Sequence, residues 1–510
     1  MTEGLTPTYT NPIGLYPFQA DHLADLLANR EARPGRLLVW DTGLGKSHAA
    51  MCAAALNLED AAADVVLLVC EKIKLREWRE DFARFTNLQV GLHHGPGRWK
   101  RLDKGLPHVL LTTYETTRTD LATATKPTGR RGTSLVHGPL LERLLASGQR
   151  PMVVFDEADR LSNRTSGIYK SWEHALAALR KRHGNPQVVG LTATPVRKEL
   201  ENAFNQLRLI APEHMPLVGE FDRYFVQFRD NYRRPTYIPD RLGDFADLAA
   251  PVLLAKSKQD ADVRAQFPAM TEESLWVDLG ADQRALYNLV AALGDVDGSL
   301  AALRQICGHP EAILHSAEHG TSRLARDLVA ELGQDYFRAL GSGKTDRLVE
   351  YLTPVVLGQD DKAVVFSFFG PSVLPLLQRA LERAGMRTWT HDAEDGIAAF
   401  QRASGGGVLL CSDAAARGIN LPQASYLVEY DMASTYGLRT QRLNRISRIG
   451  QGGPTATVRS MIVRDSVEVG LMHLMLAGNL QHDALLGTET GETHMTAAMR
   501  KQLLREGQYA

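Results

Sequence analysis

The chain has 510 residues, more than one ordinary hydrophobic core can organise, so we expect about two to four domains. Apolar residues make up 44% and charged residues 23% of the chain, proportions that are typical of a soluble globular protein and exclude a largely disordered one. The formal net charge is −1, so a nucleic-acid partner would have to bind in a local groove and not on a basic surface as a whole.

Several features of the sequence favour the cytoplasm. The polar segment Met1–Pro12 lacks the apolar core of a signal peptide. The longest apolar runs, such as Val65–Cys70, are only strand-sized, so we expect no membrane association. No two cysteines have CxxC spacing, which fits a reducing compartment; they are Cys52, Cys70, Cys307 and Cys411. We expect a monomer in the cytoplasm of a bacterium or of a phage-infected cell.

From about Arg36 to Ile210, short apolar segments alternate with amphipathic helical patterns. This alternation is typical of a parallel α/β sheet whose strands are buried on both faces. The predicted strands are Leu37–Trp40, Val65–Cys70, Val109–Thr113, Met152–Asp156 and Val188–Thr192. We expect residues 1–210 to form the first domain.

A glycine-rich loop follows the first of these strands, at Trp40-Asp-Thr-Gly-Leu-Gly-Lys-Ser47, and a helical pattern comes directly after it. A strand, a loop and a helix in this order form a phosphate-binding loop. Lys46 would reach the β- and γ-phosphates of ATP, and the Ser47 hydroxyl would ligate Mg²⁺. The expected ATP-binding residues of the loop are Asp41, Thr42, Gly43, Leu44, Gly45, Lys46 and Ser47. Trp40 replaces the first glycine of the general pattern, and a glycine-rich turn with a surface lysine is the alternative.

The predicted strand Met152–Asp156 ends in carboxylates. Asp156 can hold Mg²⁺, usually through water, and Glu157 can orient and deprotonate the water that attacks the γ-phosphate. A solvated acidic turn is the alternative, and the phosphate loop upstream argues against it. Thr192 and Thr194, at the next strand end, offer hydroxyls that could hydrogen-bond the acidic motif and relay its state.

A second alternating stretch runs from about Lys344 to Val463, with predicted strands Ala363–Phe368, Val408–Cys411, Tyr426–Tyr430 and Thr457–Ile462. We expect residues 344–472 to form a second α/β domain. Residues 211–343 are mostly helical in pattern and would form helical insertions and the linker, and residues 473–510 would form a helical tail. Lys126–Gly138, rich in Gly, Thr and basic residues, is predicted to be an exposed loop.

An arginine-rich run, Gln441-Arg-Leu-Asn-Arg-Ile-Ser-Arg448, lies near the end of the second domain. It places Arg445 and Arg448 three residues apart, on one face of a helix. Such arginines can neutralise the charge that develops during phosphoryl transfer, an effect worth about 10³–10⁵ in rate. Taken alone, the run is better explained as a basic, solvated helix face.

In this order, these strings resemble superfamily 2 helicases and, within them, the Swi/Snf-like branch of double-stranded-DNA translocases. Further strings carry the resemblance, namely Leu15–Gln19, Lys74–Phe85, Thr112–Tyr114, Asp156–Ser166, Leu303–Pro310, Ser342–Lys344 and Arg448–Gln451. Three segments depart from the branch: Ser412–Asn420 is closer to the DEAD-box form, Leu253–Lys258 lacks a usual pair of arginines, and Ala193 replaces a glycine. The resemblance implies an α/β fold of two RecA-like parallel-sheet lobes, with helical insertions between and on them.

The resemblance also implies an ATP hydrolase that uses ATP and Mg²⁺. Gln19 would read the adenine edge, and Gly418 would border the nucleotide. The expected catalytic residues are Lys46, Glu157, Gln441, Arg445 and Arg448. ATP would bridge the two lobes, so that binding and hydrolysis alternately close and open them and move the protein along its track.

We expect the track to be double-stranded DNA, held mostly through its phosphates. The candidate contacts are Lys72, Lys74, Thr113, Tyr114, Ser367, Ser412 and Arg417. A strand-separating DNA or RNA helicase is the nearest alternative, although no wedge-like segment is visible in the sequence. A non-catalytic nucleic-acid-binding scaffold is a third, and the intact catalytic residues argue against it.

Overall fold

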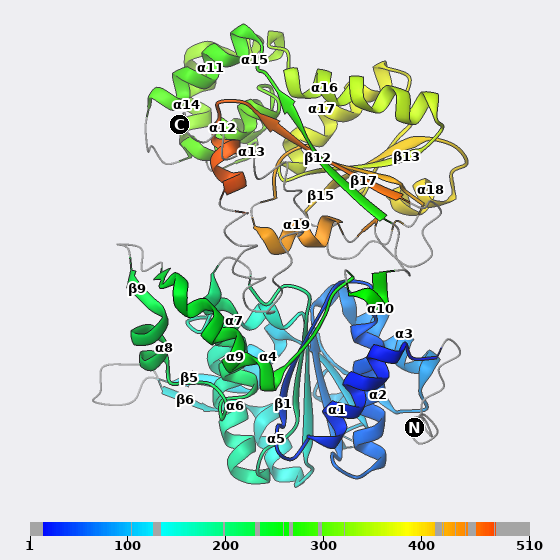
Figure 1. Ribbon diagram of the computed structural model, residues 1–510, viewed down its shortest axis with the longest axis vertical. Coiled ribbons are helices and arrows are strands. Elements are labelled where there is room, and N and C mark those ends of the chain that lie inside the picture. Colours follow the sequence, from blue (N-terminus) through cyan, green and yellow to red (C-terminus); the bar gives the residue numbers. More distant parts are fainter. Residues whose placement is uncertain are drawn as a thin grey trace. The chain divides into compact units, whose positions relative to one another are not determined.

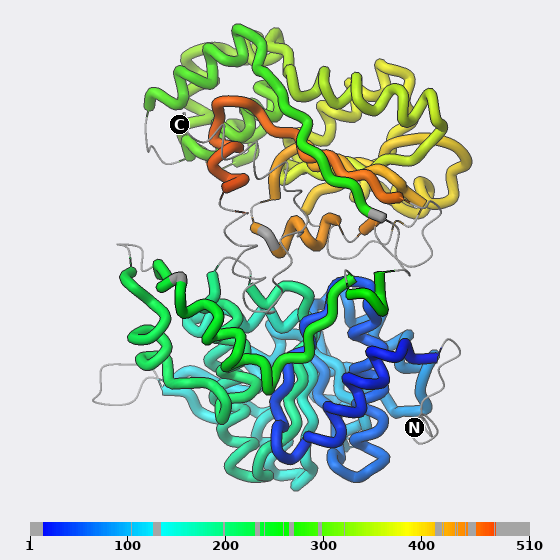
Figure 2. The backbone as a smooth tube through the Cα atoms, viewed as in Figure 1, coloured from blue at the N-terminus to red at the C-terminus, as the bar shows by residue number. Residues whose placement is uncertain are grey.

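The computed structural model describes residues 14–103, 105–125, 134–196, 199–229, 235–258, 260–264, 269–293, 298–320, 322–413, 421, 423–433, 435–443, 445–446, 455–473 and 475. The chain divides into two compact units, the first ending at Arg264 and the second beginning at Ala265. Figure 2 follows the backbone from the blue N-terminal part of the first unit to the orange and red end of the second.

The first unit is built on a seven-stranded sheet in which every neighbouring pair of strands is parallel. In sheet order the strands are β11 (Leu253–Lys256), β1 (Gly35–Trp40), β8 (Val188–Thr192), β7 (Pro151–Asp156), β2 (Val65–Cys70), β4 (Val109–Thr113) and β3 (Val90–His93). The five central strands are fully buried, which explains their continuous apolar sequences. All five strands predicted in this unit are therefore confirmed, and β3 and β11 are additions at the two edges.

Helices cover both faces of this sheet (Figure 1), as burial of both faces requires. On one face lie α1 (Pro17–Ala28), α2 (Lys46–Glu59) and α3 (Leu75–Phe85). On the other lie α4 (Tyr114–Asp120), α5 (Pro139–Ser147), α6 (Gly167–His183) and α7 (Leu200–Ile210). The core of the second face is centred on Phe155 of β7, whose ring contacts Trp172 of α6 edge-on at 4.7 Å.

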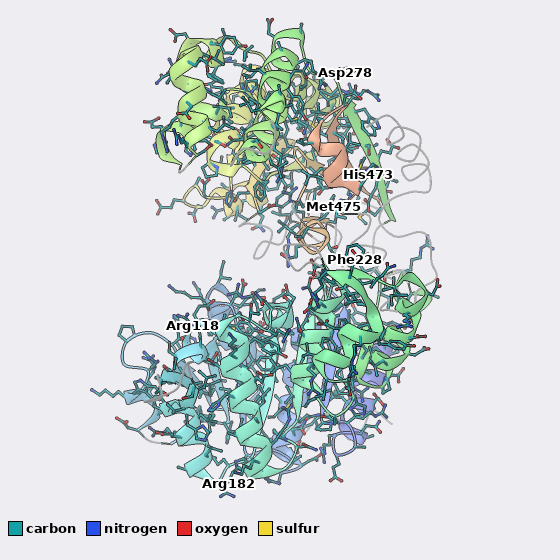
Figure 3. All side chains as sticks on the ribbon, turned by 90° about the vertical axis from the view of Figure 1, so that its left-hand side faces the viewer. Arg118, Arg182, Phe228, Asp278, His473 and Met475 are labelled. Atoms are coloured by element: carbon teal, nitrogen blue, oxygen red, sulfur yellow. The ribbon has the colours of Figure 1, made fainter. Side chains whose placement is uncertain are left out.

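Smaller elements extend the first unit. They are α8 (Val218–Phe225), α9 (Leu242–Ala249), α10 (Ala261–Arg264), the antiparallel pair β9 (Val226–Arg229) and β10 (Pro235–Tyr237), and the antiparallel pair β5 (Ala122–Thr125) and β6 (Ser134–His137). On β9, Phe228 is exposed (Figure 3). The prediction of a loop over Lys126–Gly138 is wrong for residues 134–137, because they pair with β5; residues 126–133 lie outside the described part of the chain.

The second unit contains a six-stranded sheet that is also parallel throughout. In sheet order its strands are β12 (Ala269–Val277), β17 (Thr455–Val463), β16 (Tyr426–Glu429), β13 (Lys362–Ser367), β15 (Gly407–Ser412) and β14 (Thr388–Thr390). The four strands predicted here are confirmed, with end points that differ by one or two residues. The two strands that the sequence pattern did not reveal, β12 and β14, lie at the edges.

Helices of the second unit form two cores, one on each face of its sheet. The larger core involves α11 (Ala281–Ala292), α12 (Ser299–Gly308), α13 (Ala312–His319), α14 (Arg323–Leu332), α15 (Gln334–Ala339), α16 (Gly343–Thr353) and α17 (Gly370–Arg383). The smaller core involves α18 (Gly396–Arg402) and α19 (Tyr436–Leu443).

Residues 211–343, predicted to be mostly helical, also supply strands to both sheets. β11 pairs with β1 in the first unit, and β12 pairs with β17 in the second, so the boundary at Arg264 falls inside this segment. The β12 sequence hides its strand because polar residues occupy both of its faces: Thr271 and Glu273 are exposed on one face, whereas Glu272 between them is buried on the other.

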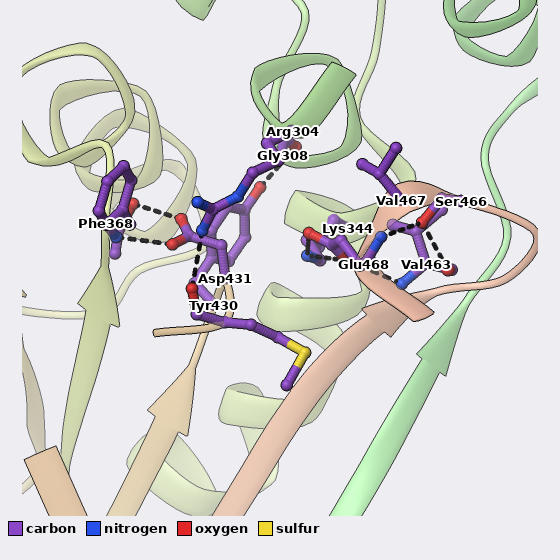
Figure 4. Close-up of polar contacts among 12 residues, drawn as sticks. Arg304, Gly308, Lys344, Phe368, Tyr430, Asp431, Val463, Ser466, Val467 and Glu468 are labelled. Atoms are coloured by element: carbon purple, nitrogen blue, oxygen red, sulfur yellow. Dashed lines mark hydrogen bonds and ion pairs between the residues drawn. The ribbon is translucent and has the colours of Figure 1, made fainter. Parts of the chain in front are cut away.

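A buried ion pair joins the start of α16 to the segment after β17 in the second unit (Figure 4). Lys344 Nζ donates to both carboxylate oxygens of Glu468, at 2.6 and 2.8 Å, and the two side chains are almost completely buried. Glu468 also accepts a hydrogen bond from the Val463 amide at 2.9 Å. Beside the pair, the Tyr430 hydroxyl donates to the carbonyl oxygen of Gly308 at 2.7 Å.

We predict that Lys344→Met strongly destabilises the second unit. Removing one partner of a buried pair leaves an uncompensated charge and typically costs about 3–5 kcal/mol. The double variant Lys344→Met/Glu468→Gln should recover part of this loss, because the glutamine carries no charge. Urea denaturation followed by circular dichroism measures the change.

Arg323→Ala is the matched control, because Arg323 forms an ion pair with Asp327 in which both side chains are largely exposed. A Lys344→Met variant as stable as this control would contradict the prediction.

Candidate active site

The glycine-rich loop of the first unit connects β1 to α2, and α2 begins at Lys46. Gly43 and Gly45 have φ angles of 89° and 81°, a backbone region that favours glycine. Lys46 Nζ donates to the carbonyl oxygens of Trp40 and Asp41, at 2.7 and 3.3 Å. The amino-terminal N–H groups of α2 and the lysine charge therefore meet at the loop, which is the arrangement that binds phosphate.

Gln19 of α1 is attached directly to this loop. It is buried, its Nε2 donates to the Leu44 carbonyl oxygen at 2.8 Å, and its Oε1 accepts from the Tyr16 amide at 2.9 Å. A Cβ atom at Gly45 would lie 2.4 Å from Gln19 Nε2. The backbone conformation therefore favours glycine at position 45, and a Cβ atom there would make the Gln19 side chain shift.

Two loop residues have structural partners that the sequence did not indicate. The Asp41 carboxylate accepts hydrogen bonds from the Ser257 hydroxyl and the Lys258 amide, at 3.1 and 2.8 Å, so it ties the loop to the turn after β11. The Trp40 indole donates to His22 Nδ1 at 3.0 Å and is fully buried. Trp40, which replaces a glycine of the general pattern, thus fastens α1 to β1.

Asp156 and Glu157 lie at the carboxyl end of β7. The Asp156 carboxylate is largely buried and accepts a hydrogen bond from Trp78 Nε1 at 2.7 Å. The Tyr114 hydroxyl donates to the main-chain carbonyl oxygen of Asp156, also at 2.7 Å. Glu157 has φ 53° and ψ 58°, a left-handed conformation that is uncommon for a residue with a Cβ atom and that concentrates at functional sites.

Burial raises the pKa of the Asp156 carboxyl to about 6, and the neighbouring charge of Glu157 adds to the rise. The hydrogen bond from Trp78 and the charges of Lys74 and Lys46 oppose it. A carboxylate that is buried beside a lysine and another carboxylate fits a cation site better than a purely structural role.

The donors present fit Mg²⁺, which prefers oxygen ligands and usually keeps water and phosphate oxygens among them. Ser47 at the start of α2 and Asp156 at the end of β7 would hold it. Within the described part of the chain, no group of three or more His, Cys, Asp or Glu side chains forms a separate metal site.

Thr192 and Thr194 lie at the end of β8, the strand between β1 and β7. Both are buried, and the Thr194 amide donates to Thr192 Oγ1 at 3.0 Å. The carboxyl ends of β1, β8 and β7 therefore bring the phosphate loop, the two threonines and the carboxylates to one edge of the sheet. This juxtaposition agrees with the predicted coupling role, which stays a prediction.

The arginine-rich run begins in α19 (Tyr436–Leu443) of the second unit, and Arg445 lies in a turn after this helix, so the prediction that Arg445 lies on a helix is wrong. Gln441 and Arg445 are largely buried, and Arg445 Nε donates to the Gln441 carbonyl oxygen at 3.0 Å. The predicted site residues Arg448, Gly418 and Arg417 lie outside the described residues. The interpretation of the run as a solvated basic face is wrong for its described residues, because their side chains are buried.

Two arginines of α19 that were not predicted as site residues fix the helix to its sheet. Arg439 donates to Glu429 and Glu272, at 2.9 and 2.8 Å, and all three side chains are buried. Arg442 donates to Asp413 at 2.6 Å and to the carbonyl oxygen of Asp431 at 2.7 Å. Buried charges thus hold in place the helix that carries Gln441, and the hydrogen bond from Arg445 to Gln441 ties the following turn to it.

Three of the residues predicted to contact the nucleic acid are buried in the structure. Thr113 caps α4 by accepting from the Thr116 amide, and it is fully buried, as is Tyr114. Ser367 is also fully buried and donates to Asp431 at 2.6 Å. These three side chains are therefore not available as surface contacts in this structure, because each satisfies a polar group inside its own unit.

The remaining described candidates are at least partly accessible. Lys72 is exposed, and Lys74 is partly exposed and forms an ion pair with Glu77 at 2.7 Å. Ser412 is partly buried, with its hydroxyl 2.9 Å from His391 Nε2. Lys72 and Lys74 are the candidates that combine accessibility with positive charge.

Two parallel sheets with helices on both faces, one of them carrying a phosphate loop and an acidic strand end, define a helicase-type core of two RecA-like lobes. Models of known families match the chain as a SNF2-related domain over residues 18–312 and as a helicase conserved C-terminal domain over residues 344–450. The first match covers more than half of the sequence, and the chain belongs to the SNF2-related family. The predicted membership of superfamily 2 and its Swi/Snf-like branch is confirmed.

Individual relatives are distant. The chain is 23% identical to the putative ATP-dependent helicase/translocase YwqA of Bacillus subtilis, over 96% of this chain and 50% of that protein. It is 27% identical to the RNA polymerase-associated protein RapA of Sodalis glossinidius, over 86% of this chain and 46% of that protein. It thus spans about half the length of these relatives. The helicase domain of Pyrococcus furiosus Hef has the same fold, with a TM-score of 0.51 and 16% identity over 90% of this chain and 97% of that one.

One further property concerns membranes. Across the described ranges, no helix combines the length and the apolar character that crossing a bilayer would require.

We predict that Asp156→Asn raises the thermal stability of the first unit at pH 7.5. A carboxyl whose pKa is higher in the folded state holds its proton better when folded, so its ionisation above pH 6 costs folding free energy. The amide removes this cost and can still accept the hydrogen bond from Trp78. The melting temperature measured by calorimetry should rise by about 2 °C or more, and the gain should shrink as the pH falls from 7 towards 4.

Asp120→Asn is the matched control in the same unit. Burial opposes ionisation of Asp120, but hydrogen bonds from His93 and Arg98 outweigh it and lower the pKa to about 2. That carboxylate stabilises the fold above the pKa of its unfolded state, so its loss should lower the melting temperature at pH 7.5. If both variants melted below the wild type, the assigned environment of Asp156 would be wrong.

Proposed function

We propose that this protein is an ATP-driven motor that hydrolyses ATP to translocate on double-stranded DNA and to remodel DNA or protein–DNA complexes. The observation that carries the proposal is the convergence of the Lys46 loop, the Thr192 strand end and the Asp156–Glu157 pair on one edge of a parallel sheet. Membership of the SNF2-related family supports the same conclusion.

In the proposed reaction, Lys46 and the amino terminus of α2 hold the β- and γ-phosphates. Ser47 and Asp156 hold Mg²⁺, which neutralises charge on the phosphates when it is bound. Glu157 orients the attacking water and accepts its proton. Arg445, with Gln441 beside it, supplies positive charge to the γ-phosphate.

The proposal that the track is double-stranded DNA rests on other observations. The predicted branch moves on duplex DNA, and sequence readout is not expected, because phosphate contacts carry no base information. Lys72 and Lys74 follow β2 at the carboxyl edge of the first sheet and are the best-placed described contacts. The absence of disulfides among the four buried cysteines suits action in the cytoplasm.

We predict that Glu157→Gln lowers the rate of phosphate release by about 10²-fold or more, because it removes the group that accepts the proton of the attacking water. Nucleotide affinity should stay close to that of the wild type. Phosphate release measured under saturating ATP tests this. Glu331→Gln, a substitution at an exposed position of α14, is the charge-matched control and should behave as the wild type. Unchanged hydrolysis in Glu157→Gln would refute the assigned mechanism.

We also predict that duplex DNA stimulates the ATPase more than single-stranded DNA or RNA of equal nucleotide concentration. Parallel ATPase assays with the three polymers at one fixed ionic strength provide the comparison, because phosphate contacts depend on salt. Lys72→Ala, at an exposed position, should weaken stimulation by duplex without lowering the basal rate. Stimulation by single strands alone would instead favour a strand-separating helicase.

A further inference from the structure

Trp78 of α3 meets Asp156, the proposed metal-binding carboxylate at the end of β7. Its side chain is 2% exposed, and its Nε1 lies 2.7 Å from Asp156 Oδ2. Buried residues of α3 recur at helical spacing, and the Trp78 ring packs against Phe82 at 5.9 Å. The indole is therefore held by the packing of its helix and has little freedom to turn away from the carboxylate.

The position of Asp156 follows from the alternation of β7. Val153 and Phe155 face the core formed with α4–α7, so Asp156 faces the opposite side, where α2 and α3 cover the sheet (Figure 1). Its side chain thus shares a face with the helix that begins at Lys46. Trp78 reaches it from α3 on this face, whereas Tyr114 reaches its carbonyl oxygen from α4.

An indole N–H can only donate a hydrogen bond and has no charge of its own. It can therefore fix the direction of a carboxylate without competing with Mg²⁺ for the negative charge, as a lysine or an arginine would. The bond engages Oδ2 and leaves the lone pairs of Oδ1 for other partners. Because the hydroxyl of Tyr114 holds the main chain at the same residue, hydrogen bonds within the first unit orient both the backbone and the side chain of Asp156.

We propose that Trp78 is a positioning residue, which orients the Asp156 carboxylate and thereby sets how much Mg²⁺ strengthens the binding of ATP. This inference rests on the proposed function as an Mg²⁺-dependent ATPase. Trp78 touches neither nucleotide nor metal in this account; it acts through Asp156. Partners of a metal ligand typically contribute about 10–100-fold to metal affinity.

The test is the ratio of two dissociation constants for a non-hydrolysable ATP analogue, measured with EDTA and with Mg²⁺. Trp78→Phe keeps the aromatic packing and removes the donor. We expect the ratio to fall by about tenfold, with the constant in EDTA unchanged. Trp172→Phe is the matched control, because Trp172 is also fully buried in this unit and its Nε1 donates to the Thr117 hydroxyl at 3.1 Å. It should keep the wild-type ratio.

A folded Trp78→Phe variant with the wild-type ratio would overturn the proposal, while the ATPase assignment would stand. A failure of the wild-type protein to bind ATP would instead contradict the proposed function. If Trp78→Phe does not fold, ¹⁵N-labelled tryptophan in the wild type gives a second test. The Trp78 indole resonance should shift when Mg²⁺ is added to the ATP-bound protein and should not shift in Asp156→Ala; the absence of any shift in the wild type would also overturn the proposal.

Discussion

The parallel pairing of β1, β8 and β7 is the constraint on which the first unit depends. Parallel strands end at the same edge of a sheet, so the segments that leave these three strands must lie side by side. Here those segments are the phosphate loop, the threonine-containing turn and the Asp156–Glu157 pair. The apolar strands are buried on both faces, and their packing fixes where each strand ends. It thereby fixes the positions of the polar residues that follow the strands.

The cost of the arrangement is a negative charge close to the core. Burying a carboxylate is unfavourable unless hydrogen bonds compensate it, and the raised pKa of Asp156 shows that Trp78 compensates only in part. The left-handed conformation of Glu157 adds local strain. A surrounding core of large aromatic side chains keeps both features in place, as the packing of Phe155 against Trp172 illustrates.

In the second unit, buried carboxylates are instead paired with buried arginines. Arg439 lies between Glu429 and Glu272, which belong to two strands of the same sheet, and so connects α19 to both. Such networks add little net stability compared with apolar packing, but breaking one partner is expensive. They therefore favour one position of α19, and with it one position of Gln441 and Arg445.

Strong local patterns made much of this protein predictable. The nine predicted strands are all present, because buried parallel strands are continuous apolar runs. Two edge strands, β11 and β12, were missed because their sequence patterns are weak. In β12, for example, the buried Glu272 lies between exposed residues. The 211–343 segment was therefore predicted to be mostly helical. Thr113, Tyr114 and Ser367 were predicted as surface contacts from their place after strands, a pattern that says nothing about burial.

The sequence by itself determined the class of protein, the phosphate loop and the acidic pair, since these depend on residue types at fixed short spacing. Only the tertiary structure decided which partners those residues have. Trp78 and Asp156 are 78 positions apart, and Asp41 and Lys258 are separated by 217. Contacts of this kind arise from the order of strands in the sheet and from the face on which each side chain emerges, and no local sequence pattern encodes either.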